Sequence, residues 1–387
     1  MFRKTRAIIN KHIKIVVGVV VAVLLIVFIM GPLRTAFTGV VGAARSTKEE
    51  ITLFNDMMRR GGDSPRSESA PSSPESSSSK EHEEGSSSSS RPSGNSPSFL
   101  DGSFEYNEEN DESEGVKVGS GEVGAEVHFI AVGNADAILI KSDGEYMLID
   151  AGEAVVGDVV VDYLMDMGVN RLELVVATHP HSDHIGGIPA VIEAFDVEKM
   201  MMPDVVNSTR AFSDLIEAIE DYEIDVEVPR LGDRFSLGGS TFTVYGPSKE
   251  HENLNDNSIV LRMEYGTTSF LFTGDIEEEA ESYLVGLAAL PKTNVLKVPH
   301  HGSSGSSSND FIRKISPRYA VFTCGEVMGF DDTDYGHPHS ATLSRYKVYS
   351  TLNRLDIFRT DTQGHVVAYS DGTDIEFETQ FAFEAAA

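Results

Sequence analysis

Residues 178–184 read THPHSDH and follow directly on a predicted buried strand. Three histidines and a carboxylate within six residues, at a strand-to-helix turn, are ligands that transition metals prefer in proteins. Alternate residues of an extended loop point to one side. We therefore expect His179 and His181 to meet one ion, while Asp183 and His184 face another. The alternative is a polar loop that merely collects imidazoles, and this density of ligands disfavours it.

Two later segments supply what a two-metal site would still need. Residues 269–273 form a predicted strand that ends just before Asp275, and residues 295–299 form another that ends before His300 and His301. We predict that Asp275 bridges the two metals and that His300 is the remaining ligand of the second. Two such ions lower the pKa of a water between them, so the sequence predicts hydrolysis by a metal-bound hydroxide.

Elsewhere past residue 123, short apolar strands alternate with helical stretches. This order favours sheets layered with helices, an α/β (α+β) fold with active residues on loops at strand ends. The predicted strands are 126–132, 136–140, 146–149, 172–177, 197–202, 241–245, 259–264, 269–273, 294–298, 319–323 and 365–370. The predicted helices are 155–167, 185–195, 208–221, 276–289, 307–314 and 340–352.

Several of these segments carry a resemblance to a known family. HPHSDH at 179–184, LIDAG at 148–152, LFTGD at 271–275 and KVPHHGS at 297–303 together resemble the metallo-β-lactamase superfamily. The runs VGNADAILI, NDNSIVLR and YGHPH resemble more specifically the extracellular hydrolase domain of ComEC, a bacterial DNA-uptake channel protein, and its stand-alone secreted relatives. The likeness spans about residues 123–377. It implies a four-layer αββα sandwich with the metals at one edge between the two sheets.

The resemblance also implies roles for individual residues. Asp150 matches an acidic residue that braces the metal loop through hydrogen bonds. Two divalent ions are implied, with zinc the expected metal and manganese the alternative. The implied metal ligands are His179, His181, Asp183, His184, Asp275 and His300.

The chain departs from the superfamily pattern in two places. Most members carry a histidine in the segment before the GD strand, whereas residues 255–258 read NDNS. The first metal is therefore expected to have fewer imidazole ligands, with help from Asp256 or Asn257. His251 is a weaker candidate, because a lone histidine in a polar loop is more often solvent-exposed. Residues 131–135 also differ from the DVGQGD run that is usual in the ComEC-like group.

A second histidine-rich run lies at His337 and His339, on either side of a proline. In the functional interpretation, one of these imidazoles or His301 contacts the substrate phosphate or protonates the leaving group. We take Asp183, His301 and His339 as the catalytic candidates. The alternative is a loop that caps the helix predicted to begin at Ser340.

The N-terminal region is organised differently. Residues 1–14 are basic and precede an apolar run at 15–33. At about 1.5 Å per residue this run is long enough to cross a bilayer core of roughly 30 Å. Basic residues before the run outnumber those after it, which predicts a cytoplasmic N-terminus and an extracellular remainder. A cleaved signal peptide, which would make the protein secreted, is the alternative.

Residues 34–122 are a predicted linker. Between Ser64 and Ser98 lie 17 serines and five prolines. Such a composition cannot bury enough surface to offset its conformational entropy, so we predict a disordered tether. The hydrolase domain is expected at 123–377, followed by a C-terminal tail at 378–387.

Charge limits the choice of substrate. Residues 116–387 carry 45 Asp or Glu against 18 Lys or Arg, so the surface should repel phosphate backbones. If DNA binds, the metals and basic residues near the site such as Lys297, Arg313 and Lys314 must supply the attraction. Cys324 is the only cysteine, which excludes an intrachain disulfide, and its place in an apolar strand predicts an inert thiol.

The sequence thus predicts a membrane-anchored, extracellular, metal-dependent hydrolase, with a phosphodiester such as DNA as substrate. Hydrolysis of choline-phosphate on cell-wall polymers, or of another small phosphodiester, would avoid the charge penalty and is the first alternative. A non-catalytic surface binding module on the same fold is the second. No segment points to a particular protein partner.

Overall fold

The computed structural model describes residues 117–118, 121–287, 290–325 and 336–381. The predicted membrane segment at 15–33 lies outside these ranges, as does nearly all of the predicted linker, so both stay predictions. Among the described helices, none combines the length and apolar character that crossing a bilayer requires. Within the described ranges, the first elements are the antiparallel pair β1 (Lys117–Val118) and β2 (Gly121–Glu122), which lie slightly before the predicted domain boundary.

The first sheet has eight strands. In spatial order they are β10 (Asp225–Glu227), β9 (Lys199–Met201), β7 (Leu174–Val176), β5 (Glu145–Ala151), β4 (Ala137–Ser142), β3 (Ala125–Phe129), β18 (Val366–Ser370) and β19 (Ile375–Thr379). The strands from β10 to β5 pair in parallel, and those from β5 to β19 pair antiparallel. A separate parallel pair joins β6 (Arg171–Leu172) and β8 (Asp196–Val197).

The second sheet has seven strands. In spatial order they are β11 (Arg234–Leu237), β12 (Ser240–Gly246), β13 (Val260–Tyr265), β14 (Thr268–Phe272), β15 (Val295–Lys297), β16 (Tyr319–Phe322) and β17 (Asp356–Arg359). The strands from β11 to β14 form an antiparallel meander, and those from β14 to β17 pair in parallel. Parallel pairing brings the carboxyl ends of β14, β15 and β16 to one edge.

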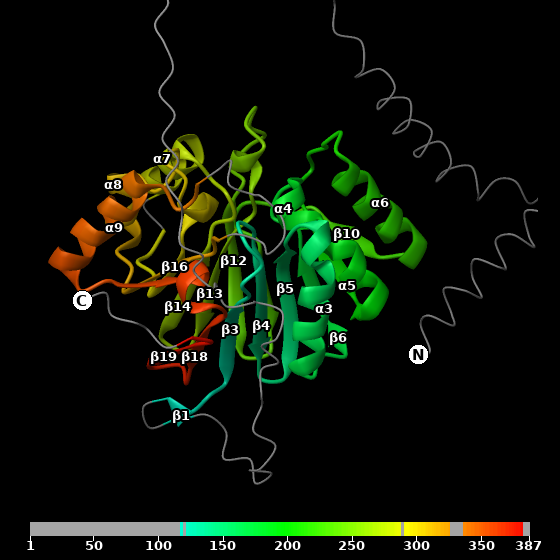
Figure 1. Ribbon diagram of the computed structural model, residues 1–387, viewed down its shortest axis with the longest axis horizontal. Helices are drawn as coiled ribbons and strands as arrows, with labels where there is room; N and C mark the ends of the chain where they lie inside the picture. Colours follow the sequence, from blue (N-terminus) through cyan, green and yellow to red (C-terminus); the bar gives the residue numbers. More distant parts are fainter. Residues whose placement is uncertain (1–116, 119–120, 288–289, 326–335, 382–387) are drawn as a thin grey trace, which may run out of the picture. The chain divides into compact units, whose positions relative to one another are not determined.

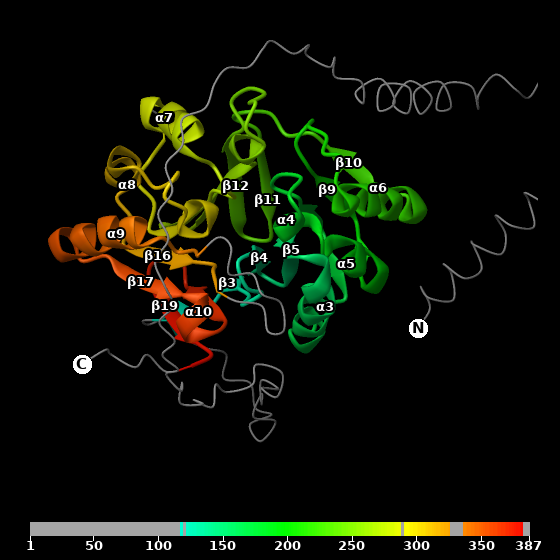
Figure 2. The ribbon, with the colours of Figure 1, turned by 45° about the horizontal axis from the view of Figure 1, so that its top comes forward.

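Helices cover the outer faces of both sheets. On the first sheet lie α3 (Gly157–Asp166), α5 (Ile188–Ala194) and α6 (Arg210–Tyr222); on the second lie α7 (Glu278–Gly286), α8 (Asn309–Ile315) and α9 (Ser340–Asn353) (Figure 1). Figure 2 shows the same division after a turn of the molecule, with α7, α8 and α9 on one flank. The shorter helices are η1 (Ala154–Val156), α4 (Ser182–Ile185), η2 (Asn255–Asn257), η3 (Pro299–Gly302) and α10 (Thr360–Gln363).

Three apolar clusters separate four layers. Along β4, Leu139 packs on the helix side with α3 and α5, whereas Ile138 packs toward the other sheet. Along β14, Phe272 faces the first sheet and Leu271 faces α7 and α8. Because successive side chains of a strand point to opposite faces, each sheet joins two cores. The predicted αββα sandwich is therefore confirmed.

Each predicted strand and helix has a counterpart in the structure, although the helix predicted at 185–195 is divided into α4 and α5. The predictions omitted four strands of the main sheets: β10, β11, β17 and β19. These four are the edge strands of the two sheets. Edge strands are short and half-exposed, and all three residues of β10 are exposed. They consequently lack the apolar run by which the central strands were predicted.

Candidate metal centre

Asp150, at the end of β5, holds the 178–184 loop. Its carboxylate accepts hydrogen bonds from the backbone N–H of Thr178 at 2.8 Å, from the Thr178 hydroxyl at 2.6 Å and from Nδ1 of His184 at 2.7 Å. Asp150 is fully buried and has a φ of 56°, a left-handed conformation that Asp adopts more readily than most residues. These contacts match the bracing role that the resemblance implies.

Asp183, His184, Asp275 and His301 form one group, whose ligand atoms all lie within 4.8 Å of one another. Nε2 of His184 lies 3.2 Å from Oδ2 of Asp275, and Nε2 of His301 lies 3.4 Å from the same oxygen. Oδ2 of Asp183 lies 3.6 Å and 3.4 Å from these two nitrogens. Two imidazoles and two carboxylates suit a divalent transition metal. We call this set the Asp275 group.

Buried polar atoms in the Asp275 group test whether a metal fits. Among the described residues, Nε2 of His184, Nε2 of His301 and Oδ1 of Asp275 have no hydrogen-bond partner. On the other side of its ring, His301 donates from Nδ1 to the backbone carbonyl of Thr323 at 2.8 Å. Buried polar atoms are ordinarily paired, and a second-sphere acceptor at Nδ1 leaves Nε2 as the ligand atom. The group therefore fits a divalent cation.

The electrostatics of the Asp275 group favour positive charge at the same point. Burial alone would raise the pKa of Asp275, but the imidazoles of His184 and His301 hold that pKa well below its ordinary value. Burial would lower the pKa of His184, and the carboxylates of Asp275 and Asp183 raise it well above its usual range. Burial would likewise lower the pKa of His301, but the carboxylate of Asp275 outweighs it and raises that pKa to about 9.

His179 and His181 form a separate imidazole pair. Nε2 of His179 lies 3.0 Å from Nδ1 of His181, close to the roughly 3.3 Å between two nitrogens bound tetrahedrally to one zinc ion. Nδ1 of His179 lies 3.3 Å from the hydroxyl of Ser258, which leaves Nε2 as the atom that faces His181. Burial lowers the pKa of both imidazoles, which keeps them neutral as metal binding requires.

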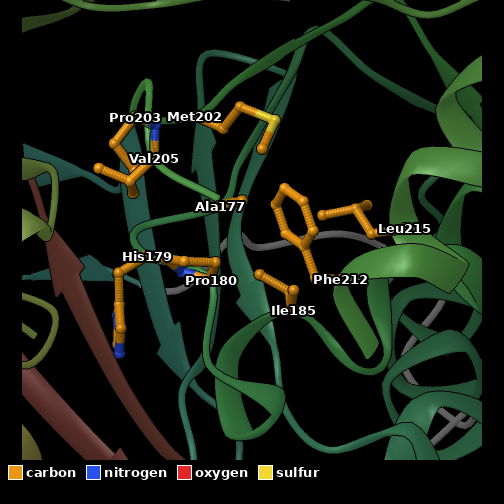
Figure 3. Close-up of a pocket in the computed structure, with 9 residues that line it drawn as sticks. All are labelled: Ala177, His179, Pro180, Ile185, Met202, Pro203, Val205, Phe212 and Leu215. Carbon is orange, nitrogen blue, oxygen red and sulfur yellow. The ribbon is translucent and has the colours of Figure 1, made fainter. Parts of the chain in front are cut away.

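An apolar pocket supports this loop from behind. In Figure 3 the imidazole of His179 is directed away from Phe212 and Leu215, which line the opposite side. Such a lining provides few polar groups for a ligand, so the pocket positions the loop. Its lining residues are Ala177, His179, Pro180, Ile185, Met202, Pro203, Val205, Phe212 and Leu215.

Comparison with known proteins agrees with this geometry. A model of the metallo-β-lactamase superfamily matches residues 130–326, about half of the chain. The chain belongs to the metallo-β-lactamase superfamily. The ComE operon protein 3 of Bacillus subtilis is 29% identical over 209 residues, which are 54% of this chain and 26% of that protein. The competence protein ComA of Neisseria gonorrhoeae is 30% identical over 236 residues, which are 60% of this chain and 30% of that protein.

The matched regions thus cover less than a third of each of these two relatives. Among solved structures, the metallo-β-lactamase fold protein YhfI of Bacillus subtilis is similar over its whole length and over 64% of this chain, with 13% identity and a TM-score of 0.42. The resemblance drawn from the sequence motifs, to this superfamily and to its competence-related members, is confirmed by the family match and the two competence proteins.

In this metallo-β-lactamase fold the structure places His301, and not His300, in the Asp275 group. The sequence had assigned that place to His300. Both residues have left-handed backbone conformations, with φ of 48° and 51°. His300 lies outside the four-residue group, with Nε2 3.7 Å from Oδ2 of Asp275 and Nδ1 2.9 Å from Oε1 of Glu277.

The residues suggested as substitutes for the missing motif histidine contact other groups of the fold. His251 is buried, and its Nδ1 lies 3.2 Å from Oε1 of Glu279. The Asn257 side chain binds the backbone N–H and carbonyl of His251. Oδ1 of Asp256 accepts from the backbone N–H of Glu277 at 2.7 Å. His251, Asp256 and Glu279 form a cluster of their own.

Lys297 is a buried counter-ion and not a surface charge for substrate. It is 1% exposed, and its Nζ lies 2.6 Å from Oδ2 of Asp136 and 3.9 Å from Oδ1 of Asp275. The expectation that Lys297 attracts DNA is therefore wrong, because its ammonium group is buried and paired with Asp136. Asp136, which also accepts from the Thr323 hydroxyl at 2.5 Å, was missed from the sequence although it ends the VGNAD run.

Of the two late histidines, His337 faces the metal centre. Its ring centroid lies 5.3 Å from that of His300 and 6.2 Å from that of His301. His339, the residue chosen from the sequence, instead accepts a hydrogen bond at Nδ1 from the backbone N–H of Ser304 and occupies the N-cap position of α9. Burial, together with the charges of His301 and His300, lowers the pKa of His337 to about 4, so this imidazole is neutral near pH 7.

Cys324 follows β16 and is buried. Burial raises the pKa of its thiol, which keeps the sulfur protonated and a poor nucleophile. This agrees with the expectation of an inert thiol.

Proposed function

We propose that this chain is a metal-dependent hydrolase of phosphodiesters, a phosphodiesterase or nuclease. The observation that carries the proposal is the Asp275 group, in which the buried Nε2 atoms of His184 and His301 converge on Asp275 without a hydrogen-bond partner. The imidazole pair of His179 and His181 adjoins it, since the rings of His179 and His184 lie 4.1 Å apart. A centre with two sets of ligands and one shared carboxylate suits a pair of divalent ions.

The chain's own residues would hold the two ions as follows. The Asp275 group would hold one, and His179 and His181 would hold the other. Zinc suits this imidazole-rich ligand set, and manganese is the alternative. When bound, the ions supply Lewis-acid stabilisation of negative charge and activation of water. Asp150 and the Thr323 carbonyl keep the ligand nitrogens oriented.

His337 is the candidate to contact the substrate. It is partly buried, it faces His300 and His301, and its Nδ1 lies 3.2 Å from Oδ1 of Asn134. Near pH 7 its neutral imidazole can donate its N–H to a phosphate oxygen and so stabilise the negative charge that develops there. His337→Ala is expected to lower kcat by about a hundredfold or more. His339→Ala is the matched comparison, and an equal loss there alone would return the role to His339.

The substrate class rests on the relatives and on charge. Two matched proteins carry competence names, which favours DNA as the phosphodiester. The formal charge of −30, however, opposes a phosphate backbone, so DNA binding should be weak and salt-sensitive. That charge favours a second candidate, a small phosphodiester such as a choline-phosphate ester, whose cationic head is attracted to an acidic surface.

A substrate panel on the full chain tests the proposal. The chain is supplied with zinc or with manganese and incubated with bis-nitrophenyl phosphate, single-stranded DNA, double-stranded DNA, a choline-phosphate ester and a β-lactam. Asp275→Ala and His181→Ala are the blanks. We expect cleavage of the phosphodiesters that both variants lack.

Two outcomes reject the proposal. If the chain retains less than one ion and cleaves nothing, it is a surface binding module on a hydrolase fold. Cleavage of the β-lactam alone would replace phosphodiesters with lactams as the substrate class. Cleavage of the choline-phosphate ester without DNA would select the second candidate.

The proposed location is the outer face of the cell membrane, through an anchor at residues 15–33. It is supported by the apolar run and by the basic residues that precede it. Protease added to intact cells should release the hydrolase domain and leave the N-terminus protected. Recovery of the whole chain in the medium would indicate a cleaved signal peptide instead.

A further inference from the structure

A cluster of His251, Asp256 and Glu279 lies outside the proposed hydrolytic centre. One ligand atom from each of the three side chains lies within 4.8 Å of the other two, and the cluster shares no residue with the Asp275 group. His251 and Asp256 belong to the connection between β12 and β13, whereas Glu279 belongs to the first turn of α7. Two segments of the chain thus bring one imidazole and two carboxylates together. We call this set the His251 group.

The His251 side chain has the features of a metal ligand. Its side chain is 1% exposed, and neither ring nitrogen has a hydrogen-bond partner among the described residues. Nδ1 lies 3.2 Å from Oε1 of Glu279, a contact that lacks the direction of a hydrogen bond. This distance is close to the roughly 3.3 Å between two ligand atoms bound tetrahedrally to one zinc ion. Because buried polar atoms are ordinarily paired, the bare nitrogens indicate a cation ligand.

Asn257 holds the backbone of His251 in place. The Asn257 side chain is fully buried. Its Oδ1 accepts from the backbone N–H of His251 at 2.9 Å, and its amide donates to the His251 carbonyl at 2.9 Å. Both backbone groups of His251 are therefore fixed by one side chain. A ligand held in this way loses little freedom when it binds an ion.

Asp256 is fixed at the start of α7. Its Oδ1 accepts from the backbone N–H of Glu277 at 2.7 Å and from that of Ala280 at 3.4 Å. A carboxylate has about four acceptor sites, so these two bonds leave it able to bind a cation as well. Burial raises the pKa of the Asp256 carboxyl, and a neighbouring cation would favour its charged form.

Glu279 closes the His251 group on its solvent side. It is 56% exposed, and its Oε1 lies 2.6 Å from Nζ of Lys249, which is 62% exposed. A positive charge thus already approaches this carboxylate. Ion pairs between exposed side chains contribute little, so a divalent ion that also binds His251 and Asp256 can displace the ammonium.

We propose that the His251 group is a further metal site, for a divalent transition ion such as zinc. One imidazole and two carboxylates suit such an ion, with water completing the coordination. Calcium and magnesium fit less well, because they take oxygen ligands. The ion would join the β12–β13 connection to α7. That connection ends at Ser258, whose hydroxyl lies 3.3 Å from Nδ1 of His179, so the ion would stabilise a support of the hydrolytic centre.

Zinc binding by the full chain tests the proposal. The chain is brought to equilibrium with zinc by dialysis in millimolar calcium, which occupies acidic surface patches, and bound zinc is counted by mass spectrometry. We expect three ions in the unaltered chain, and two in His251→Ala and in Glu279→Gln. Glu279 is exposed, so its variant should fold even if His251→Ala does not. With a single imidazole, the His251 group should release its ion in zinc-free buffer before the Asp275 group does.

Two further variants sharpen the test. Lys249→Ala removes the competing ammonium and should raise the affinity for the third ion by about two- to fivefold. His365→Asn is the matched control, because it replaces another buried histidine outside both groups and should keep three ions. Circular dichroism confirms the folding of each variant.

Equal zinc counts in the unaltered chain, His251→Ala and Glu279→Gln would overturn the proposal, and Lys249 or a proton on His251 would then be the cation of the group. An affinity that Lys249→Ala leaves unchanged would also overturn it, because Glu279 would not be a ligand. Failure of the proposed function looks different. A chain that keeps no zinc in zinc-free buffer and cleaves nothing rejects the hydrolase, whatever the His251 group binds.

Discussion

The two halves of the metal centre differ in burial and in what holds their imidazoles. In the Asp275 group, His184 and His301 are fully buried and their Nδ1 atoms bind acceptors at the ends of β5 and β16. In the other half, His179 is also fully buried but His181 is partly exposed, and Nδ1 of His179 lies beside the hydroxyls of Thr178 and Ser258. Ligands fixed by sheet ends lose little freedom on binding. We therefore expect the buried half to bind its ion more tightly and the open half to face the substrate.

Asp275 is the carboxylate proposed to serve both halves, so its removal should have the largest effect. Two ions stabilise a transition state by several kcal/mol, and each 1.4 kcal/mol is tenfold in rate. Asp275→Ala should lower kcat/KM by at least about a hundredfold on the best substrate of the panel. The same preparation should lose both ions by mass spectrometry. Retention of one tightly bound ion would show that the halves do not share this carboxylate.

Lys297 acts mainly on the buried half, because it pairs with Asp136, whose carboxylate lies 3.6 Å from Nδ1 of His301 and 3.9 Å from Nδ1 of His184. Removing one partner of a buried ion pair leaves an uncompensated charge, which costs about 3–5 kcal/mol. Lys297→Met should therefore lower the free energy of unfolding by about that amount in urea titrations, with Asp136 left unpaired.

The double variant K297M/D136N is the control for Lys297. It removes both charges and should recover most of the lost stability. If Lys297→Met instead changed only the salt dependence of DNA binding and left stability intact, Lys297 would be a substrate contact after all.

His365 serves as a reference imidazole away from the metal centre. Its Nδ1 accepts a hydrogen bond from the backbone N–H of Ala131, and burial, with the charge of His128, lowers its pKa to about 4. An unfolded histidine titrates near 6.5, so the unfolded state binds the proton first. Stability is therefore fully present above pH 6.5 and falls as the pH drops toward 4, by up to about 3 kcal/mol.

His365→Asn should flatten this pH dependence, since an amide oxygen can accept the Ala131 hydrogen bond without titrating. The measurement is the unfolding free energy of the zinc-loaded chain between pH 4 and pH 7. An unchanged slope in the variant would assign the acid sensitivity to the ligand histidines.

Asp150 should give the smallest effect of this series and the clearest distinction between the halves. It holds Nδ1 of His184 directly, whereas it reaches His179 only through the Thr178 hydroxyl. Asp150→Asn should lower the affinity of the Asp275 group for its ion by about 10- to 100-fold, measured in competition with a chelator. An equal loss of affinity for both ions would contradict the division of the centre into two halves.

The sequence predicted the central strands well and the edges of the sheets poorly. The buried central strand β7 is a continuous apolar run and β14 ends in one, Phe270 to Phe272, which a single sequence displays directly. Of the omitted strands, β10 and β17 depend on pairing with a neighbour that is distant along the chain, whereas β11 and β19 form hairpins with β12 and β18 but are partly exposed. Their residues carry little pattern of their own, as the exposed β10 illustrates.

By itself the sequence determined the layered fold and the loop that places His179, His181, Asp183 and His184 together. Both depend on local features, the apolar period of strands and helices and the spacing of ligands within one turn. The tertiary structure alone decided which of His300 and His301 joins Asp275, and that His337 and not His339 faces the centre. Those outcomes depend on left-handed backbone at adjacent residues and on contacts between segments far apart in the chain. The spacing of residues along the sequence predicts neither.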